Sequence, residues 1–379
     1  MTRLDDLARP GIVVLCGSDG VGKTTTAAAL AARAAWREDL RVAVLTIDPA
    51  RRLANAMGLR RLGNRLRQVR LEGLRRGKPQ GELYAGMLET KSAWDDLIVR
   101  QAGGEERAAP ILANPFYREI SGAFVGSHEY IAMERLYDLW QSEDFDLVVL
   151  DTPPSRNALD FLEAPNRMTE LVGGGLLGLL ARPGVFAGKV GLRLFNLTSR
   201  PVMKMADRLL GDSTLSELSE FLVSIEDFYQ GFNERAEAVY DLLQADTTAF
   251  VVVTTLEDVP FEEARFFVEK LAEAGMHIAG AVVNKTLPDF LLDSKAEALA
   301  RRLVSRSTGV ELALAQNYLD LRTLALRDRD LLARVAELGV PVIGTVPRLL
   351  EPVHDLETLL RVADMLGAGG RAGTVSRSA

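Results

Sequence analysis

The residues from 17 to 24 read GSDGVGKT and fit the pattern G-x-x-x-x-G-K-[ST] at every position. Glycines in such a loop let backbone N–H groups turn inward and surround phosphate oxygens. Lys23 is then expected to reach the β- and γ-phosphates, and the Thr24 hydroxyl to bind Mg²⁺. The chemistry that these residue types predict is the binding of a magnesium nucleotide. The residues expected to contact it are Gly17, Ser18, Asp19, Gly20, Val21, Gly22, Lys23, Thr24 and Thr25.

The elements around this loop are those that its chemistry requires. A continuous apolar run at 11–16 predicts a buried parallel strand, and an Ala-rich run at 24–38 predicts a helix. A second strand is expected at 41–48. Strand, loop, helix and strand form a βαβ unit, in which the positive end of the helix dipole points at the phosphates. In this context a chance Gly-rich turn is the weaker interpretation.

Two carboxylates end predicted strands and complete the candidate site. Asp48 closes VLTID, and Asp151 closes DLVVLD. The carboxyl ends of parallel strands line the ligand crevice of a doubly wound sheet. Asp48 is therefore a candidate for positioning the attacking water, and Asp151 for holding Mg²⁺ through its water shell. The alternative for each is an ordinary turn aspartate at a strand end.

Further strands and helices alternate along the chain. Helical patterns such as PFEEARFFVEKLAEAG (260–275) lie between short apolar runs. This alternation predicts an α/β fold of the P-loop NTPase class, with a doubly wound, mostly parallel sheet and helices on both faces. The additional strands are expected at 145–151, 249–255, 278–284 and 341–346.

The middle of the chain has a different character. Apolar residues recur there at helical spacing without a clear strand, which predicts a helical subdomain inserted into the sheet domain. We expect a single domain over 1–366 and a low-complexity, disordered tail over 367–379. The sheet core is expected from 11–87, 141–155 and 246–366, and the helical subdomain from 88–140 and 156–245.

Composition argues against several classes of protein. The net charge is −7, so a general nucleic-acid binder is not expected. The opening MTRLDDLARP is polar, and the most apolar stretch, at 171–181, is too short for a membrane span. We therefore expect a cytoplasmic protein. Arginines cluster between 51 and 76 without interleaved aromatics, which favours a solvated face over a phosphate or nucleic-acid patch.

Several motifs together resemble those of the ArsA-type anion-transporting ATPases. They include the GVGKTTTAAALA loop, TIDPARRLANAMG around Asp48, and LDTPPSRNALDFL around Asp151. GSHEYIAMERL (126–136) and VVNK (282–285) add to the resemblance, which covers most of the chain. The family includes the arsenite-pump ATPase and the targeting ATPase for tail-anchored membrane proteins. The nearest match is its bacterial, especially actinobacterial, single-unit branch.

The resemblance implies a dimeric ATPase that holds Mg²⁺ and ATP at the dimer interface. In such a protein Asp48 would activate water, and Asp151 would relay the nucleotide state. Asn284 would hydrogen-bond adenine with Pro347 in the loop beside it, and Glu257 would touch the partner's nucleotide. The helical insert would bind a hydrophobic or membrane-protein client.

The loop departs from the family pattern at two positions. The family's loop begins G-K-G-G, and its lysine reaches across the dimer to the other subunit's phosphates. Ser18 stands in place of that lysine here, and Asp19 in place of a glycine. Two like charges about 4 Å apart cost about 4 kcal/mol at an effective dielectric constant near 20. We expect slow or partner-dependent hydrolysis, by a homodimer or by a heterodimer with a paralogous ATPase that carries the lysine.

Residues for the cargoes and metals of this family are largely missing. Arsenite binding needs several thiolates, but the chain has one cysteine, Cys16, and it lacks the C-x-x-C of a dimer-bridging zinc site. The lone histidines His128 and His277 are expected to be structural. The Gly-, Leu- and Met-rich region at 168–205 fits either an adaptable apolar groove for a client or plain helical core.

Four functions remain open from the sequence. The first is an ATP-driven, client-handling or regulatory ATPase. The second is a positioning ATPase like MinD or ParA, although the C-terminal LETLLRVADMLGAGG is not a basic amphipathic helix. The third is a metabolic enzyme that transfers phosphate to a small molecule, which would need neither DTPPS nor a large helical insert. The fourth is a nucleotide-binding scaffold with little hydrolysis.

Overall fold

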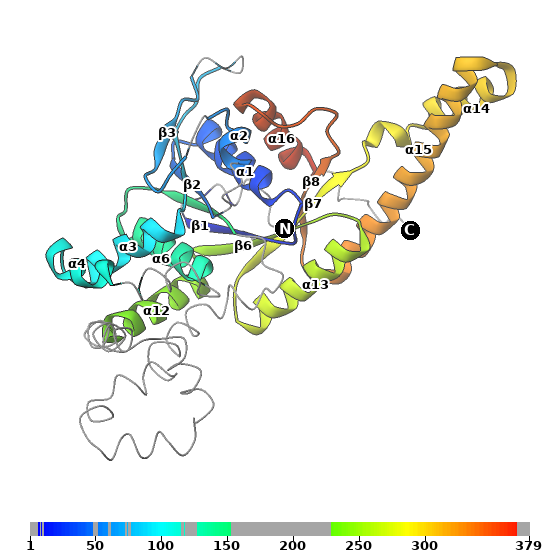
Figure 1. Cartoon of the computed structure of the whole chain (residues 1–379). Helices are drawn as coiled ribbons and strands as arrows, with labels where there is room; N and C mark the ends of the chain where they lie inside the picture. Colours follow the sequence, from blue (N-terminus) through cyan, green and yellow to red (C-terminus); the bar gives the residue numbers. More distant parts are fainter. Residues whose placement is uncertain are drawn as a thin grey trace, which may run out of the picture. The chain divides into compact units, whose positions relative to one another are not determined.

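The computed structural model contains an eight-stranded sheet with helices packed on it (Figure 1). Its residues divide into two compact units. The larger comprises Met1–Met87, Leu139–Ala158 and Gln244–Ala379 and contains the sheet, and the smaller comprises Leu88–Asp138 and Leu159–Leu243. The structure describes residues 7, 9, 11–47, 52–59, 62–72, 74, 77–114, 117, 127–152 and 229–369.

The strand order of the sheet is β3-β4-β2-β5-β1-β6-β7-β8, and all neighbours are parallel except β3 and β4. The central strands β1 and β5 are fully buried, as strands covered on both faces require. Their carboxyl ends therefore open onto a crevice between helices. The bounds are β1 Gly11–Cys16, β2 Arg41–Thr46, β3 Arg67–Val69, β4 Glu82–Met87, β5 Leu147–Asp151, β6 Thr248–Thr254, β7 Ile278–Thr286 and β8 Val342–Pro347.

Strands occur at all six places where the sequence predicts them, but the sequence missed β3 and β4. The run that forms β4, ELYAGM, contains Glu, Ala and Gly, which are depleted in strands. It becomes a strand because it pairs with β2 along the whole length of that strand, from Arg41 to Thr46. The short β3 then closes the edge by pairing antiparallel with β4.

Helices cover both faces of the sheet, which confirms the predicted α/β, doubly wound fold. α1 (Lys23–Arg37) and α16 (Leu356–Gly369) pack against each other and on one face, where the alanines of α1 allow a close approach to the strands. α13 (Asp258–Glu273) packs on β6 from the other face (Figure 1). α16 continues to Gly369, so residues 367–369 of the expected tail are helical.

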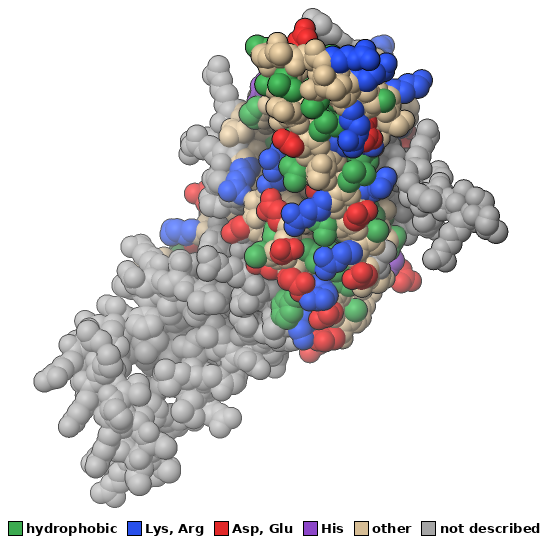
Figure 2. All heavy atoms as spheres, turned by 90° about the vertical axis from the view of Figure 1, so that its right-hand side faces the viewer, with side chains coloured by type: hydrophobic (Ala, Val, Ile, Leu, Met, Phe, Trp, Pro, Cys, Tyr) green, Lys and Arg blue, Asp and Glu red, His purple; other side chains and the backbone are tan. Residues whose placement is uncertain are grey.

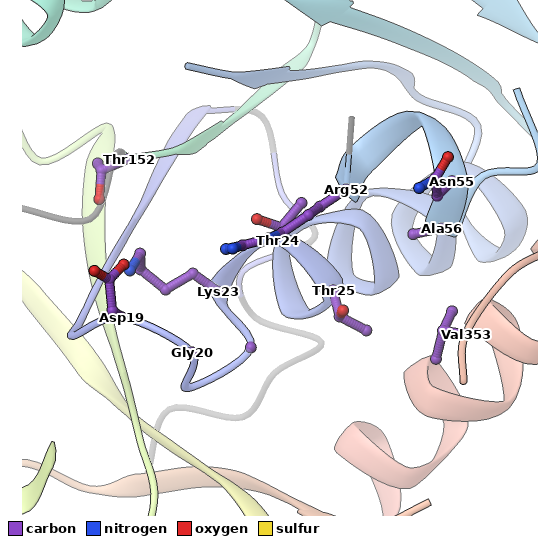
Figure 3. A pocket seen from close by; sticks show the side chains of 11 residues that line it. Asp19, Gly20, Lys23, Thr24, Thr25, Arg52, Asn55, Ala56, Thr152 and Val353 are labelled. Carbon is purple, nitrogen blue, oxygen red and sulfur yellow. The ribbon is translucent and has the colours of Figure 1, made fainter. Parts of the chain in front are cut away.

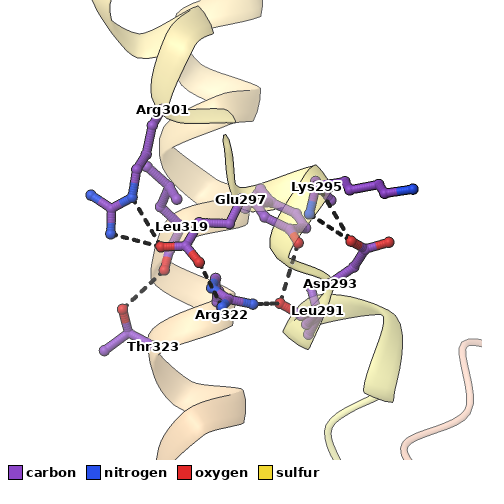
Figure 4. A network of polar contacts seen from close by, with 10 residues as sticks. Leu291, Asp293, Lys295, Glu297, Arg301, Leu319, Arg322 and Thr323 are labelled. Carbon is purple, nitrogen blue, oxygen red and sulfur yellow. Dashed lines mark hydrogen bonds and ion pairs between the residues drawn. The ribbon is translucent and has the colours of Figure 1, made fainter. Parts of the chain in front are cut away.

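A helical hairpin follows β7 and extends away from the sheet (Figure 1). The Glu297 carboxylate accepts a hydrogen bond from Arg301 at 2.9 Å and pairs with Arg322 at 2.6 Å (Figure 4). Arg322 also donates to the Leu291 carbonyl at 2.9 Å, so this guanidinium joins both helices to the turn before them. Figure 2 shows basic, acidic and apolar side chains intermixed on this side of the molecule. The hairpin helices are α14, Ser294–Arg306, and α15, Gly309–Arg334.

The smaller unit gives a structural reason for part of the GSHEYIAMERL motif. Glu134 of this motif is only 1% exposed and accepts a hydrogen bond from Arg235 at 2.5 Å. Arg235 also pairs with Asp138. Burial disfavours the charged guanidinium, but the hydrogen bonds and charges of Glu134 and Asp138 raise the pKa of Arg235 above its ordinary value. The described helices here are α3 Thr90–Gln101, α4 Glu105–Ala113, α6 Ser127–Gln141 and α12 Tyr229–Gln244.

Several features predicted from the sequence lie outside the described residues. They include Asp48, the DTPPS segment after Thr152, the Gly-, Leu- and Met-rich region at 168–205, and the chain after Gly369. Within the part of the chain that the structure describes, no helix combines the length and the apolar character that crossing a membrane requires.

Replacing Arg235 with alanine is expected to destabilise the protein by about 3 kcal/mol, because the buried Glu134 carboxylate loses its cationic partner. Arg100 pairs with Asp138 at 2.9 Å but is 43% exposed, so Arg100→Ala should cost less than about 1 kcal/mol. Urea denaturation followed by circular dichroism measures both. Equal losses in the two variants would contradict the proposed importance of the buried pair.

The hairpin should loosen in acid. The hydrogen bond from Arg301 and the charge of Arg322 lower the pKa of Glu297. A carboxylate with a lowered folded-state pKa stabilises the fold above its unfolded pKa and loses that contribution as the pH falls through the folded pKa. Amide hydrogen exchange in α14 and α15 should therefore accelerate, after correction for intrinsic rates, below about pH 4. Glu297→Gln should flatten this dependence, and Glu311→Gln, at an exposed position of α15, should preserve it.

Candidate functional site

The loop between β1 and α1 follows a path that only glycine permits at two positions. Gly17 and Gly22 have φ values of 148° and 97°. A Cβ at Gly17 would lie 2.2 Å from the Val253 carbonyl oxygen, and one at Gly22 would lie 2.1 Å from the Asn284 side-chain nitrogen. The loop is therefore fixed by its close approach to the ends of β6 and β7.

Lys23 begins α1, and its side chain folds back over the loop. Its Nζ donates to the carbonyl oxygens of Gly17 and Ser18, both at 2.8 Å, and the residue is 7% exposed. Burial lowers the pKa of Lys23, and the charges of Asp151 and Asp19 partly offset this effect. An anionic ligand would stabilise this partly desolvated ammonium further. Phosphate oxygens are therefore suited to replace the two carbonyls as its acceptors.

The Asp151 carboxylate joins three parts of the structure. Its Oδ2 accepts hydrogen bonds from the Thr24 hydroxyl at 2.6 Å and from the Thr46 hydroxyl at 2.8 Å. Asp151 is 1% exposed and lies at the end of β5, in register with Leu15 of β1 and with Thr46 of β2. The phosphate loop, the second strand and the strand that ends in Asp151 thus meet at one carboxylate oxygen.

A cavity of about 340 Å³ opens beside the N-terminus of α1 (Figure 3). Its volume falls within the range of small-ligand pockets, about 300–1,000 Å³. Its walls combine charged and hydroxyl side chains with a few apolar ones. Lining residues come from the loop and the first turn of α1, from α2 (Arg52–Ala56), and from Thr152 and Val353.

The two unusual loop residues differ in their surroundings. Ser18 Oγ is buried and has no hydrogen-bond partner among the residues that the structure describes. The Asp19 carboxylate points toward the Lys23 ammonium at the edge of the cavity (Figure 3). The charge of Asp19 favours the protonated form of Lys23. Asp19 therefore neutralises part of the positive charge that a polyphosphate would need.

The end of β7 supports the loop from the other side. Asn284 Nδ2 donates to the Val21 carbonyl at 2.7 Å, and Lys285 Nζ donates to the Gly20 carbonyl at 2.7 Å. The backbone N–H of Lys285 donates to Asn284 Oδ1 at 2.8 Å. Lys285 has φ of 60°, which is uncommon for a residue with a side chain, and it lies where the pairing of β7 with β8 shifts register. Asn284 and Lys285 together clamp the loop backbone.

The remaining predicted site residues are spread around this centre. Glu257 is the exposed N-cap residue of α13, and Pro347 ends β8 beside β7. Neither lines the cavity. Asp48 is outside the described residues, although β2 ends at Thr46, two positions before it.

Sequence reasoning missed several residues of this region, including the lining residues Ala56, Thr152 and Val353. The sequence did contain a signal for Thr46, because it is a polar residue at the carboxyl end of a buried strand. Arg52 and Asn55 lie in the arginine-rich stretch that was interpreted as a solvated face; both are exposed, and they also line the cavity. Lys285 stood in the VVNK motif, but the bend that aims its side chain at the loop has no sequence signal.

The donors and acceptors of the cavity fit a magnesium nucleotide. Lys23 and Arg52 supply positive charge to its lining. Ser18 does not line the cavity, and its buried hydroxyl has no hydrogen-bond partner among the described residues. Thr24 and Asp151 offer hydroxyl and carboxylate oxygens, the ligand types that Mg²⁺ prefers. Of the lining residues that the structure describes, Asp19 is the one whose charge opposes a phosphate.

The parallel sheet, the glycine loop and the Lys23–Thr24–Asp151 arrangement define a P-loop NTPase. A family model described as anion-transporting ATPase matches residues 11–320, and the chain belongs to this family. Among similar proteins, ATPase GET3 of Eremothecium gossypii is 22% identical over 281 residues, which cover 72% of this chain and 70% of that protein. ATPase asna-1 of Caenorhabditis elegans is 23% identical over 302 residues, which cover 76% and 78%.

Thr46→Val should destabilise the protein by about 1.5–3 kcal/mol, because it removes a buried hydrogen bond to a charged group with little change in volume. Thr46→Ser keeps the hydroxyl and should recover most of this loss. Guanidinium denaturation monitored by tryptophan fluorescence gives both values. If valine and serine had equal effects, the Thr46–Asp151 bond would carry no stability.

Proposed function

We propose that this chain is a switch ATPase that binds Mg²⁺ and ATP and hydrolyses ATP to ADP and phosphate. The observation that carries the proposal is the 2.6 Å contact between Thr24 and Asp151, with Lys23 beside it at the cavity. P-loop NTPases use a hydroxyl, a carboxylate and a lysine in this combination to hold the metal and the phosphates. Membership of a family of ATPases supports hydrolysis as the reaction.

The residues of the loop have distinct roles in this proposal. Lys23 Nζ exchanges its two carbonyl acceptors for oxygens of the β- and γ-phosphates. Thr24 ligates the metal, and Asp151 holds the metal's water shell. Mg²⁺, when bound, neutralises phosphate charge and polarises the transferred group. The phosphate-binding residues are Gly17, Ser18, Asp19, Gly20, Val21, Gly22 and Thr25, several of them through backbone N–H groups.

Asp48 is the proposed activator of the attacking water. It follows Thr46 by two residues, and Thr46 is hydrogen-bonded to the same oxygen of Asp151 that Thr24 contacts. If metal binding draws Thr24 away from Asp151, Thr46 no longer shares its acceptor oxygen with Thr24. The environment at the end of β2 then changes. The position of Asp48 would then depend on the nucleotide, which is the behaviour expected of a switch segment.

The proposed base-side contacts follow the family resemblance. Asn284 would hydrogen-bond adenine, with Pro347 beside it, and Glu257 would approach a partner's nucleotide. Asn284 uses both ends of its amide within the chain, toward Val21 and Lys285. An adenine contact would therefore require Asn284 to give up or share one of these bonds.

The proposed assembly is a dimer, either of two copies or with a paralogous ATPase that carries the lysine replaced here by Ser18. The Asp19–Lys23 attraction supports slow or partner-dependent hydrolysis, because Asp19 competes with phosphate for the ammonium. We place the protein in the cytoplasm and give it a hydrophobic or membrane-protein client. Neither nucleic-acid binding nor a membrane span forms part of the proposal.

The Asp19–Lys23 attraction also favours a second candidate function, a nucleotide-binding scaffold with little hydrolysis. A positioning ATPase of the MinD kind is less well supported. Its C-terminal helix would need a free apolar face for the membrane. The apolar residues Leu359, Leu360 and Leu366 of α16 are instead buried in the core that α16 shares with α1.

Hydrolysis and self-association should be measured together on the purified chain. We expect Mg²⁺-dependent phosphate release, with a dimer that forms or tightens with ATP in light scattering. Lys23→Met should weaken ATP binding at least about tenfold, since it removes a charge-assisted contact. Asp48→Asn should keep ATP binding but lower kcat by about 100-fold or more, since it removes the proposed activator of water.

The outcomes separate the candidate functions. ATP binding by a monomer with negligible turnover would favour the scaffold or a paralogous partner. Turnover that survives Asp48→Asn would remove Asp48 from its role, and phosphate transfer to an added small-molecule acceptor would favour a metabolic kinase. No ATP binding by the unmodified chain would overturn the proposed function.

A further inference from the structure

Arg52 places a second cation in the cavity. It is the first residue of α2, whose Leu53, Ala54 and Ala56 are buried in the core shared with α1. The buried residues fix the backbone of this short helix, while Arg52 itself is exposed. Its side chain points toward Thr24 (Figure 3), and both residues line the cavity. The fold therefore brings Arg52 into the same cavity lining as the first turn of α1.

The charges around Arg52 indicate what it could bind. Among the described residues, the cavity is lined by two cations, Lys23 and Arg52, and by one anion, Asp19. Burial is the main cause of the lowered pKa of Lys23, and the charge of Arg52 acts in the same direction. Two cations close enough to repel each other are stabilised when an anion lies between them. A guanidinium also matches phosphate oxygens with two parallel N–H donors.

We propose that Arg52 is a phosphate-binding residue of this cavity, contacting the β- and γ-phosphate end of the nucleotide beside Thr24. The inference rests on the proposed function, because it takes the ligand to be a nucleoside triphosphate. It assigns to α2 a part of the site that the loop motif does not contain. It also gives the chain a phosphate contact of its own that offsets the charge of Asp19.

The test compares Arg52→Gln, Arg52→Lys and the unmodified chain in binding a fluorescent ATP analogue with Mg²⁺, with inorganic tripolyphosphate and adenosine as competitors. We expect Arg52→Gln to weaken ATP and tripolyphosphate by the same factor, roughly 10- to 100-fold, and to leave adenosine unchanged. Arg52→Lys should keep part of the affinity but not the bidentate contact. Arg67→Gln, a change of the same type at an exposed position of β3, should bind like the unmodified chain.

Two results would overturn the inference. One is an Arg52→Gln variant that binds ATP within about twofold of the unmodified chain, since loss of a charged hydrogen bond costs more than that. The other is a variant that loses affinity for ATP but not for tripolyphosphate, because Arg52 would then contact the base or the ribose. An unmodified chain that binds ATP without hydrolysing it would count against the proposed hydrolysis and not against Arg52. Thermal unfolding of each variant checks that the fold is retained.

Discussion

The arrangement around the loop depends on one carboxylate oxygen. Asp151 is almost fully buried, and a buried carboxylate is tolerated only when hydrogen bonds or cations satisfy it. The hydroxyls of Thr24 and Thr46 supply two of these contacts. The need to satisfy Asp151 thus holds the start of α1 and the end of β2 at the end of β5. The same oxygen atoms suit a hydrated Mg²⁺, so the interaction that stabilises the fold here also prepares the site for a metal.

The charges around the cavity explain why phosphate binding by this loop has to compete with contacts within the protein. Lys23 is held by backbone carbonyls and attracted by Asp19, so phosphate binding must compete with contacts that already satisfy the ammonium. Competition of this kind lowers affinity without removing the site. Arg52 acts in the opposite direction, because it adds a second positive charge to the lining of the cavity. These three side chains contribute to the net attraction for a polyphosphate, beside the backbone N–H groups of the loop and the N-terminus of α1.

The fold and the loop could be predicted from the sequence because both depend on local sequence patterns. Continuous apolar runs predict buried parallel strands, and each of the six predicted strands is present. β4 was not predicted because its sequence is poor in strand-forming residues. It forms a strand because it pairs with β2. Thr46, Arg52 and Lys285 were not predicted as site residues for a related reason. Their positions at the site follow from strand register, from the packing of α2 and from a backbone bend, and none of these is encoded by neighbouring residues.

The bend at Lys285 connects the two ends of the proposed nucleotide site. A left-handed conformation costs a residue with a side chain roughly 1–2 kcal/mol, so it persists only where surrounding contacts compensate. The compensation here consists of the bonds from Asn284 and Lys285 to the loop carbonyls. The strand end that the family resemblance assigns to adenine is therefore the one that holds the phosphate loop in place. If adenine draws Asn284 away from Val21, the loop loses a support at the moment when phosphates can replace it. Base and phosphate recognition would then be coupled through β7, because both would act on the same support of the loop.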